Sequence, residues 1–134
     1  MLGHIGLNVD DLGAAVAYYD ELMALVGFEP FLRADDQAAY RPAGGKPGTY
    51  LFLYPAADPG PGPYSRHRTG LQHLAFIVPT RSAVDAVHEW AVARDAEILH
   101  PPRPFPEYPP PYYATFWLDP WGFMLEAVCH KDRA

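Results

Sequence analysis

The order of apolar and polar residues at the start of the chain predicts a strand followed by a helix. HIGLNV, at residues 4–9, alternates the two kinds, as a half-buried β-strand does. Asp10 or Asp11 can cap the helix that follows, and Gly27 ends it. Between the cap and the stop, apolar residues recur every three or four positions, as in an amphipathic helix: Leu12, Ala15, Val16, Tyr19, Leu22, Met23 and Val26.

The second half of the chain repeats this succession. QHLAFIVP, at residues 72–79, predicts another strand, and Thr80 can cap a helix with the apolar stripe Val84, Val87 and Ala91. Each helix is followed by three extended segments separated by turn residues. They are FEPFLRA, QAAYRP and TYLFLYP in the first half, and AEILH, YYATFWL and FMLEAVCH in the second. The pattern predicts an α+β fold made of two βαβββ modules.

Proline and glycine mark the connections. AADPGPGPYSRHRTG, at residues 56–70, predicts a linker between a first module at about 1–55 and a second at about 71–130 of one domain spanning 1–134. PPRPFPEYPPP, at residues 101–111, cannot join a ladder in mid-sheet, because proline lacks the amide donor. We expect a long loop there that could cover a cavity mouth, with His100 beside it as a loop residue able to reach the cavity.

The composition of the chain argues against several classes of function. With 134 residues, 49% of them apolar, the chain has room for one compact domain. A net charge of −6 without a basic cluster argues against a nucleic-acid partner. Cys129 is the single cysteine, which excludes an internal disulfide. The apolar runs are too short to cross a bilayer and the start lacks a secretion signal, so we expect a soluble, cytoplasmic protein without a membrane partner.

Three side chains are candidate metal ligands. His4 and His73 head the two matching strands, and the alternation places both on the face turned away from the helices. Glu126 is an ionisable residue in a run that otherwise predicts a buried strand, and an unpaired carboxylate there would cost several kcal/mol. Two imidazoles and one carboxylate suit a divalent metal. Spacing alone does not establish that the three converge.

Four aromatic residues share the parity of the candidate ligands. Tyr50, Phe52, Tyr112 and Phe116 are predicted to point away from the helices. They could form the wall of a substrate site or simply pack in the core, as aromatic residues in strands usually do.

From His4 to His130 the chain resembles the vicinal oxygen chelate superfamily, which includes glyoxalase I, extradiol dioxygenases, fosfomycin-resistance transferases and bleomycin-resistance proteins. The similar segments are GHIGLNVDDLGAAVAYYDELMALVGF, QHLAFIVPT and LDPWGFMLEAV. The resemblance implies that paired βαβββ modules form an open, cup-like mixed sheet. It implies one divalent metal ion (Fe, Mn, Zn, Ni or Co) held by His4, His73 and Glu126, and a homodimer.

The chain departs from each named activity of that superfamily. Glyoxalase I typically has a further glutamate on the last strand of the first module, at the position of Phe52 here. Extradiol dioxygenases usually carry a tyrosine ten residues before the last ligand, where this chain has Phe116. Fosfomycin-type transferases carry a threonine two residues after the first histidine, where this chain has Gly6. The sequence fully matches none of the three.

The function predicted from these features is a divalent-metal enzyme that acts as a Lewis acid on a small, apolar or aromatic, oxygen-bearing substrate. Proton transfer, addition to an epoxide and oxygen insertion all stay open. The catalytic acid or base is unassigned, although Tyr112 could donate a proton. The alternative is a metal-free protein of the bleomycin-resistance type that sequesters a small molecule, and an acidic chain would suit a cationic drug. A third reading is a scaffold or regulatory domain that retains only the fold.

Overall fold

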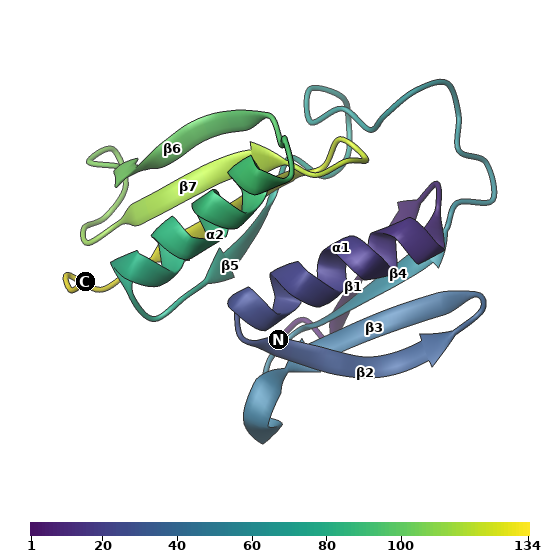
Figure 1. The fold of residues 1–134 in the computed structure, drawn as a ribbon, viewed down its shortest axis with the longest axis horizontal. Helices are drawn as coiled ribbons and strands as arrows, with labels where there is room; N and C mark the ends of the chain where they lie inside the picture. Colours follow the sequence, from purple (N-terminus) through teal and green to yellow (C-terminus); the bar gives the residue numbers. More distant parts are fainter. The chain divides into compact units, whose positions relative to one another are not determined.

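The computed structural model describes all residues, 1–134, as two compact units, Met1–Gly62 and Pro63–Ala134 (Figure 1). Each unit has one helix and one four-stranded mixed sheet. The predicted α+β fold with two βαβββ modules is confirmed.

The first unit contains one parallel and two antiparallel strand pairs. The sheet order is β1-β4-β3-β2, with β1 parallel to β4 and the other neighbours antiparallel. The elements are β1 (His4–Val9), α1 (Leu12–Leu25), β2 (Phe28–Ala34), β3 (Gln37–Pro42), a single turn of 3-10 helix (Ala43–Gly45) and β4 (Tyr50–Pro55).

The second unit repeats this topology. Its sheet order is β5-β8-β7-β6, with β5 parallel to β8 and the remaining pairs antiparallel. The elements are β5 (Leu74–Ile77), α2 (Arg81–Ala93), β6 (Ile98–Pro104), β7 (Tyr113–Leu118) and β8 (Met124–Cys129). Neither sheet closes into a barrel.

The two helices begin where the sequence predicts and bury the predicted stripes. The Asp11 side chain accepts a hydrogen bond from the amide of Ala14 at 3.1 Å, and the Thr80 hydroxyl accepts one from Ala83 at 3.1 Å. Gly27, just past α1, has a φ of 88°, a conformation that glycine adopts without strain. Neither helix has the length and apolarity needed to cross a membrane. The fully buried helix residues are Ala15, Tyr19, Leu22 and Met23 in α1 and Val84, Val87 and Ala91 in α2.

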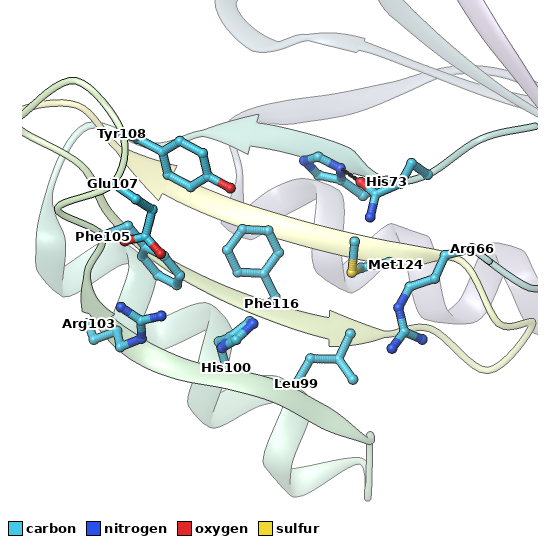
Figure 2. Close-up of a pocket in the computed structure, with 11 residues that line it drawn as sticks. Arg66, His73, Leu99, His100, Arg103, Phe105, Glu107, Tyr108, Phe116 and Met124 are labelled. Carbon is cyan, nitrogen blue, oxygen red and sulfur yellow. Dashed lines mark hydrogen bonds between the residues drawn. The ribbon is translucent and has the colours of Figure 1, made fainter.

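Strand parity separates a helix-facing side of each sheet from the opposite side. Helix α1 packs on β2, β3 and β4, and α2 packs on β6, β7 and β8. Leu53 and Leu125 are fully buried, whereas Phe52, Leu53's neighbour in β4, is half-buried on the other side. In the second unit Phe116 and Met124 point away from α2 (Figure 2). The predicted alternation is therefore confirmed.

One prediction about the proline-rich segment is wrong. Residues 101–104 continue β6 instead of starting a loop, and His100 lies on this strand. Strand β6 is at the edge of its sheet, with register shifts on both sides of His100 in its pairing with β7. An edge strand tolerates proline because one row of its backbone groups needs no partner in the sheet.

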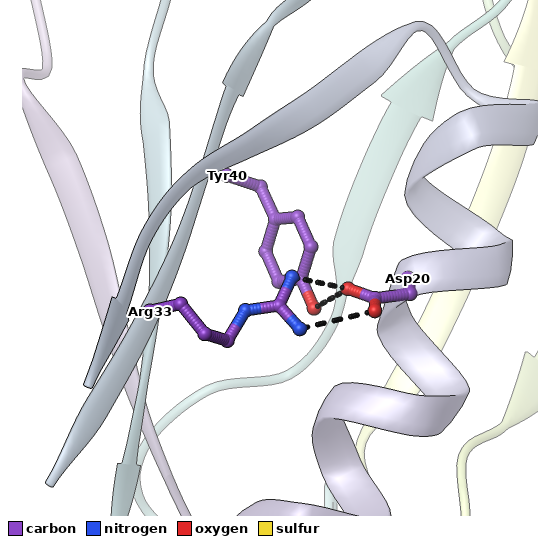
Figure 3. A network of polar contacts seen from close by, with 3 residues as sticks. All are labelled: Asp20, Arg33 and Tyr40. Carbon is purple, nitrogen blue, oxygen red and sulfur yellow. Dashed lines mark hydrogen bonds and ion pairs between the residues drawn. The ribbon is translucent and has the colours of Figure 1, made fainter. Parts of the chain in front are cut away.

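A polar network joins α1 to the sheet of the first unit (Figure 3). Arg33 of β2 donates two hydrogen bonds to the Asp20 carboxylate, at 3.1 and 2.8 Å, and the Tyr40 hydroxyl of β3 donates a third at 2.8 Å. Burial alone would raise the pKa of Asp20, but the hydrogen bonds from Arg33 and Tyr40 outweigh it and lower that pKa. Burial and the bond to Asp20 raise the pKa of Tyr40 above its usual range.

The lowered pKa of Asp20 predicts acid-dependent stability. We expect Asp20→Asn to lower the free energy of unfolding at pH 7 by about 1 kcal/mol, a small effect because the ion pair is partly exposed. A depressed folded-state pKa contributes stability above the unfolded value of 3.8, and this contribution is lost as the pH falls through the folded value. Urea titrations from pH 3 to 7 should show the difference from the parent shrinking toward acid. Asp36→Asn, an exposed carboxylate outside the network, is the control; an equal loss in both variants would contradict the assignment.

Candidate functional site

The strand registers identify equivalent positions in the two units. Gly6 is opposite Phe52 in the β1–β4 pair, and Ala75 is opposite Glu126 in the β5–β8 pair. Phe52 and Glu126 are therefore structural equivalents. His4 and His73 are equivalent too, since His4 lies two residues before the partner of Phe52 and His73 lies two residues before the partner of Glu126.

Glu126 lies on the central strand β8 and is fully buried, with 1% of its side chain exposed. Its Oε1 lies 3.1 Å from Nε2 of His73, the residue before β5. The hydroxyl of Tyr112, the residue before β7, donates to its Oε2. Both carboxylate oxygens are thus engaged, which offsets much of the cost of removing the charge from water.

Tyr112 is held in this position by its surroundings. Its ring packs edge-on against His130, with 5.1 Å between the ring centroids, and lies 4.7 Å from the Tyr108 ring. Burial, followed by the hydrogen bond to Glu126, raises the pKa of Tyr112 well above its usual range. The Tyr112 hydroxyl therefore stays protonated and serves as a donor to the carboxylate.

The other ring nitrogen of His73, Nδ1, also has a partner. Gln72 Oε1 contacts Nδ1 of the ring, so a proton on Nδ1 has an acceptor. With that proton on Nδ1, Nε2 presents a lone pair toward Oε1 of Glu126, as a metal-ligating histidine does. With the proton on Nε2 instead, the ring donates an ordinary hydrogen bond to the carboxylate, so the donor and acceptor roles depend on the tautomer.

A cavity of about 420 Å³ opens beside this pair in the second unit (Figure 2). Phe116 of β7 forms its floor, between the rings of His73 and His100, with centroid distances of 5.8 and 5.4 Å. The volume is that of a small-molecule site. The lining residues are Arg66, Gln72, His73, Leu99, His100, Arg103, Phe105, Glu107, Tyr108, Phe116 and Met124.

Sequence reasoning missed most of this lining. Met124 shares the parity of Glu126 and could have been placed from that signal. Arg66 lies in the predicted linker and Arg103 among the prolines, where no periodic pattern exists to orient a side chain. His100 was predicted as a loop residue that could reach the cavity, and it lines the cavity from a strand.

The equivalent surface of the first unit is aromatic. The ring of His4 lies 4.9 Å from that of Phe52, and Phe52 stacks on Tyr54 at 6.1 Å. Tyr50 packs edge-on against Phe31 at 5.1 Å. Phe52 thus occupies, next to His4, the place that Glu126 occupies next to His73.

The predicted site residues divide between the units. His73, Glu126, Tyr112 and Phe116 lie together in the second unit, and His4, Tyr50 and Phe52 lie together in the first. Within either unit, no group of three or more His, Cys, Asp or Glu side chains could hold a metal ion. Convergence of His4 with His73 and Glu126 stays a prediction.

The chain belongs to the glyoxalase/bleomycin resistance protein/dioxygenase superfamily, whose family model matches residues 1–127. Members of this superfamily are typically metal-dependent and bind small-molecule substrates. The protein YqjT of Bacillus subtilis is 30% identical over 127 residues, covering 93% of this chain and 95% of YqjT.

Solved structures with the same fold support this assignment. A glyoxalase-like protein of Bacillus halodurans superimposes with a TM-score of 0.81 and 32% identity, covering 96% of this chain and 95% of the other. The fosfomycin resistance protein FosX of Listeria monocytogenes superimposes with a TM-score of 0.69 and 19% identity, covering 98% and 94%. At 19% identity, the similarity to FosX shows a shared fold alone.

The bond from Tyr112 to Glu126 is open to a direct test. We expect Tyr112→Phe to lower the free energy of unfolding by about 1–3 kcal/mol, because a buried carboxylate oxygen loses its donor. Urea denaturation measures this loss. Tyr108→Phe is the matched control, since that hydroxyl has no hydrogen-bond partner in the structure although its ring touches Tyr112. Equal stabilities of the two variants would show that the bond contributes nothing.

Proposed function

We propose that the protein is a divalent-metal-dependent enzyme acting on a small oxygen-bearing substrate, with His4, His73 and Glu126 as the metal ligands. The observation that supports it most is the buried Glu126 carboxylate facing Nε2 of His73 at 3.1 Å. Polar groups that converge beside a cavity are typical of functional sites.

The spacing of these two atoms suits a metal ion. Metal bonds to histidine nitrogen and carboxylate oxygen are about 2.0–2.2 Å long, so two ligands at right angles lie about 3 Å apart. Nε2 of His73 and Oε1 of Glu126 match that separation. His4 is the third candidate by its equivalence to His73. When bound, the ion would supply Lewis-acid stabilisation of charge on a substrate oxygen.

The surrounding residues of the chain supply orientation and exclusion of water. Tyr112 engages Oε2 of Glu126 and so directs Oε1 toward His73. Gln72 Oε1 contacts Nδ1 of His73 and would accept its proton's hydrogen bond in the tautomer that leaves Nε2 as the ligand atom. Phe116 forms an apolar floor beside the pair, which lowers the local dielectric constant and strengthens electrostatic interactions there.

A second candidate function is metal-free binding of a small molecule. It is favoured by the first unit, where Phe52 replaces a potential carboxylate ligand and stacks on Tyr54 at 6.1 Å. Such a surface can hold a flat apolar compound without any metal. From the family resemblance we also propose a homodimer and a cytoplasmic location.

Metal content distinguishes the two functions. We expect the purified protein to hold about one equivalent of a divalent metal among Fe, Mn, Zn, Ni and Co, measured by elemental analysis after reconstitution. Glu126→Gln, His73→Ala and His4→Ala should each weaken metal binding by more than about 100-fold, because each removes a ligand. Tyr112→Phe should weaken it by about 10-fold, since it only orients Glu126.

His67→Ala is the control, because His67 is an exposed histidine between two arginines and does not line the cavity. It should keep the metal content of the parent. Trace metal in the parent and in all variants would end the enzyme proposal and favour metal-free binding.

A further inference from the structure

We infer that the cavity of the second unit recognises a substrate with an anionic group, a carboxylate or a phosphate-type group, attached to an apolar body. The inference deepens the proposed function by naming the substrate class of that site. It rests on the charges that line the cavity and not on the identity of the metal.

Arginine outnumbers acidic residues in the lining of the cavity, although acidic residues outnumber basic ones in the whole chain. Arg66 and Arg103 contribute two guanidinium groups, against a single lining carboxylate, Glu107. Neither arginine forms an ion pair with an acidic residue. The buried Glu126 carboxylate has both its oxygens engaged by His73 and Tyr112. An excess of arginine in a concave surface attracts and fixes anions.

Arg103 is held in place at one end of the cavity (Figure 2). Its guanidinium lies over the Phe105 ring, 3.7 Å from the centroid, and Nη1 donates to the carbonyl of Pro104 at 2.9 Å. The hydrogen bond to Pro104 uses one of the five N–H donors of the guanidinium and leaves the others available. Because the side chain is already stacked, binding an anion costs less conformational entropy than ordering a free arginine.

Arg66 lies toward the other end of the cavity, on a segment that is hydrogen-bonded to the turn between β7 and β8 (Figure 2). The amide of Tyr64 donates to the carbonyl of Trp121 at 2.9 Å, and the Tyr64 hydroxyl donates to the carbonyl of Leu71 at 3.0 Å. The amide of His67 donates to Ser65 Oγ at 3.2 Å and closes a turn around Arg66. This turn positions a guanidinium from a segment that has no regular secondary structure.

Apolar residues occupy the space between the two arginines. Phe116 lies between the two imidazoles, and Leu99 and Met124 flank it (Figure 2). A ligand of this size would place a ring or hydrocarbon body on Phe116 and an anionic end at an arginine. The net charge of −6 is that of the whole chain, whereas the cavity lining has two arginines and one carboxylate. A cationic ligand, which the overall charge suggested, is disfavoured here.

Four small probes of similar shape test the charge preference: benzoate, phenylphosphonate, neutral benzamide and the benzamidinium cation. Binding to the 134-residue chain is followed by NMR titration. We expect both anions to bind at least about fivefold tighter than benzamide, and benzamidinium to bind weaker than benzamide. The ratio of the two anion affinities tells a carboxylate site from a phosphate-type site. This comparison needs no variant.

Variants assign the preference to the arginines. Arg66→Gln and Arg103→Gln should each weaken anion binding by about fivefold and the double variant by more, with benzamide unchanged. Arg68→Gln is the matched control, an exposed arginine two residues from Arg66 that does not line the cavity; it should bind as the parent does. Anion affinity that persists in the double variant, or benzamidinium binding as tightly as benzoate, would overturn the inference.

Metal content measured on the same samples separates this inference from the proposed function. Each titration is run on metal-loaded and on chelator-treated protein. Anion preference without any metal binding would sustain the inference and end the enzyme proposal. Metal binding without anion preference would do the reverse. A preference that appears only in the loaded protein, and survives in the double variant, would assign anion binding to the metal and overturn the role of the arginines.

Discussion

A buried carboxylate constrains the arrangement of the second unit. Strand β8 is buried along its whole length, and Glu126 lies at its centre with 1% of its side chain exposed. A charge in that position is tolerated only when both oxygens have partners, since water cannot reach them. One partner, His73, immediately precedes the parallel neighbour β5, and the other, Tyr112, immediately precedes the antiparallel neighbour β7. The placement of both neighbouring strands is thus coupled to a single ionisable group.

The first unit shows what the same backbone does without that constraint. Its strand order and registers repeat those of the second unit, yet Phe52 takes the place of Glu126. His4 then packs against an aromatic ring instead of facing a carboxylate. The polar anchors of this unit lie elsewhere, at the Asp20–Arg33–Tyr40 network between helix and sheet (Figure 3). Two copies of one topology therefore carry different chemistry, because the site depends on side chains at equivalent positions and not on the fold.

The parts of the structure that follow from periodicity could be predicted from the sequence. The helix stripes, the caps at Asp11 and Thr80, and the two faces of each sheet all result from burial of apolar residues at fixed intervals. The extension of β6 through its prolines could not be predicted from the sequence. Whether a strand tolerates proline depends on the position of that strand in the sheet. The cavity arginines were missed for a related reason. The direction of Arg66 depends on a segment hydrogen-bonded to Trp121, which is far away in sequence. The direction of Arg103 depends on stacking over Phe105, outside any periodic pattern.

The two kinds of polar group in the second unit differ in what holds them. Glu126 lies on an interior strand of the sheet, where replacing it would remove its side-chain bonds to His73 and Tyr112. Arg66 and Arg103 are supported by an irregular segment and an edge strand, which tolerate substitution better than a central strand. The proposed metal site at Glu126 and the proposed charge selection by the two arginines can therefore vary independently. A substitution at either arginine would change which molecule is bound beside Glu126, while His73 and Tyr112 stay in contact with the carboxylate. This division gives a physical reason why one superfamily fold can serve many small-molecule substrates with few changes to its core.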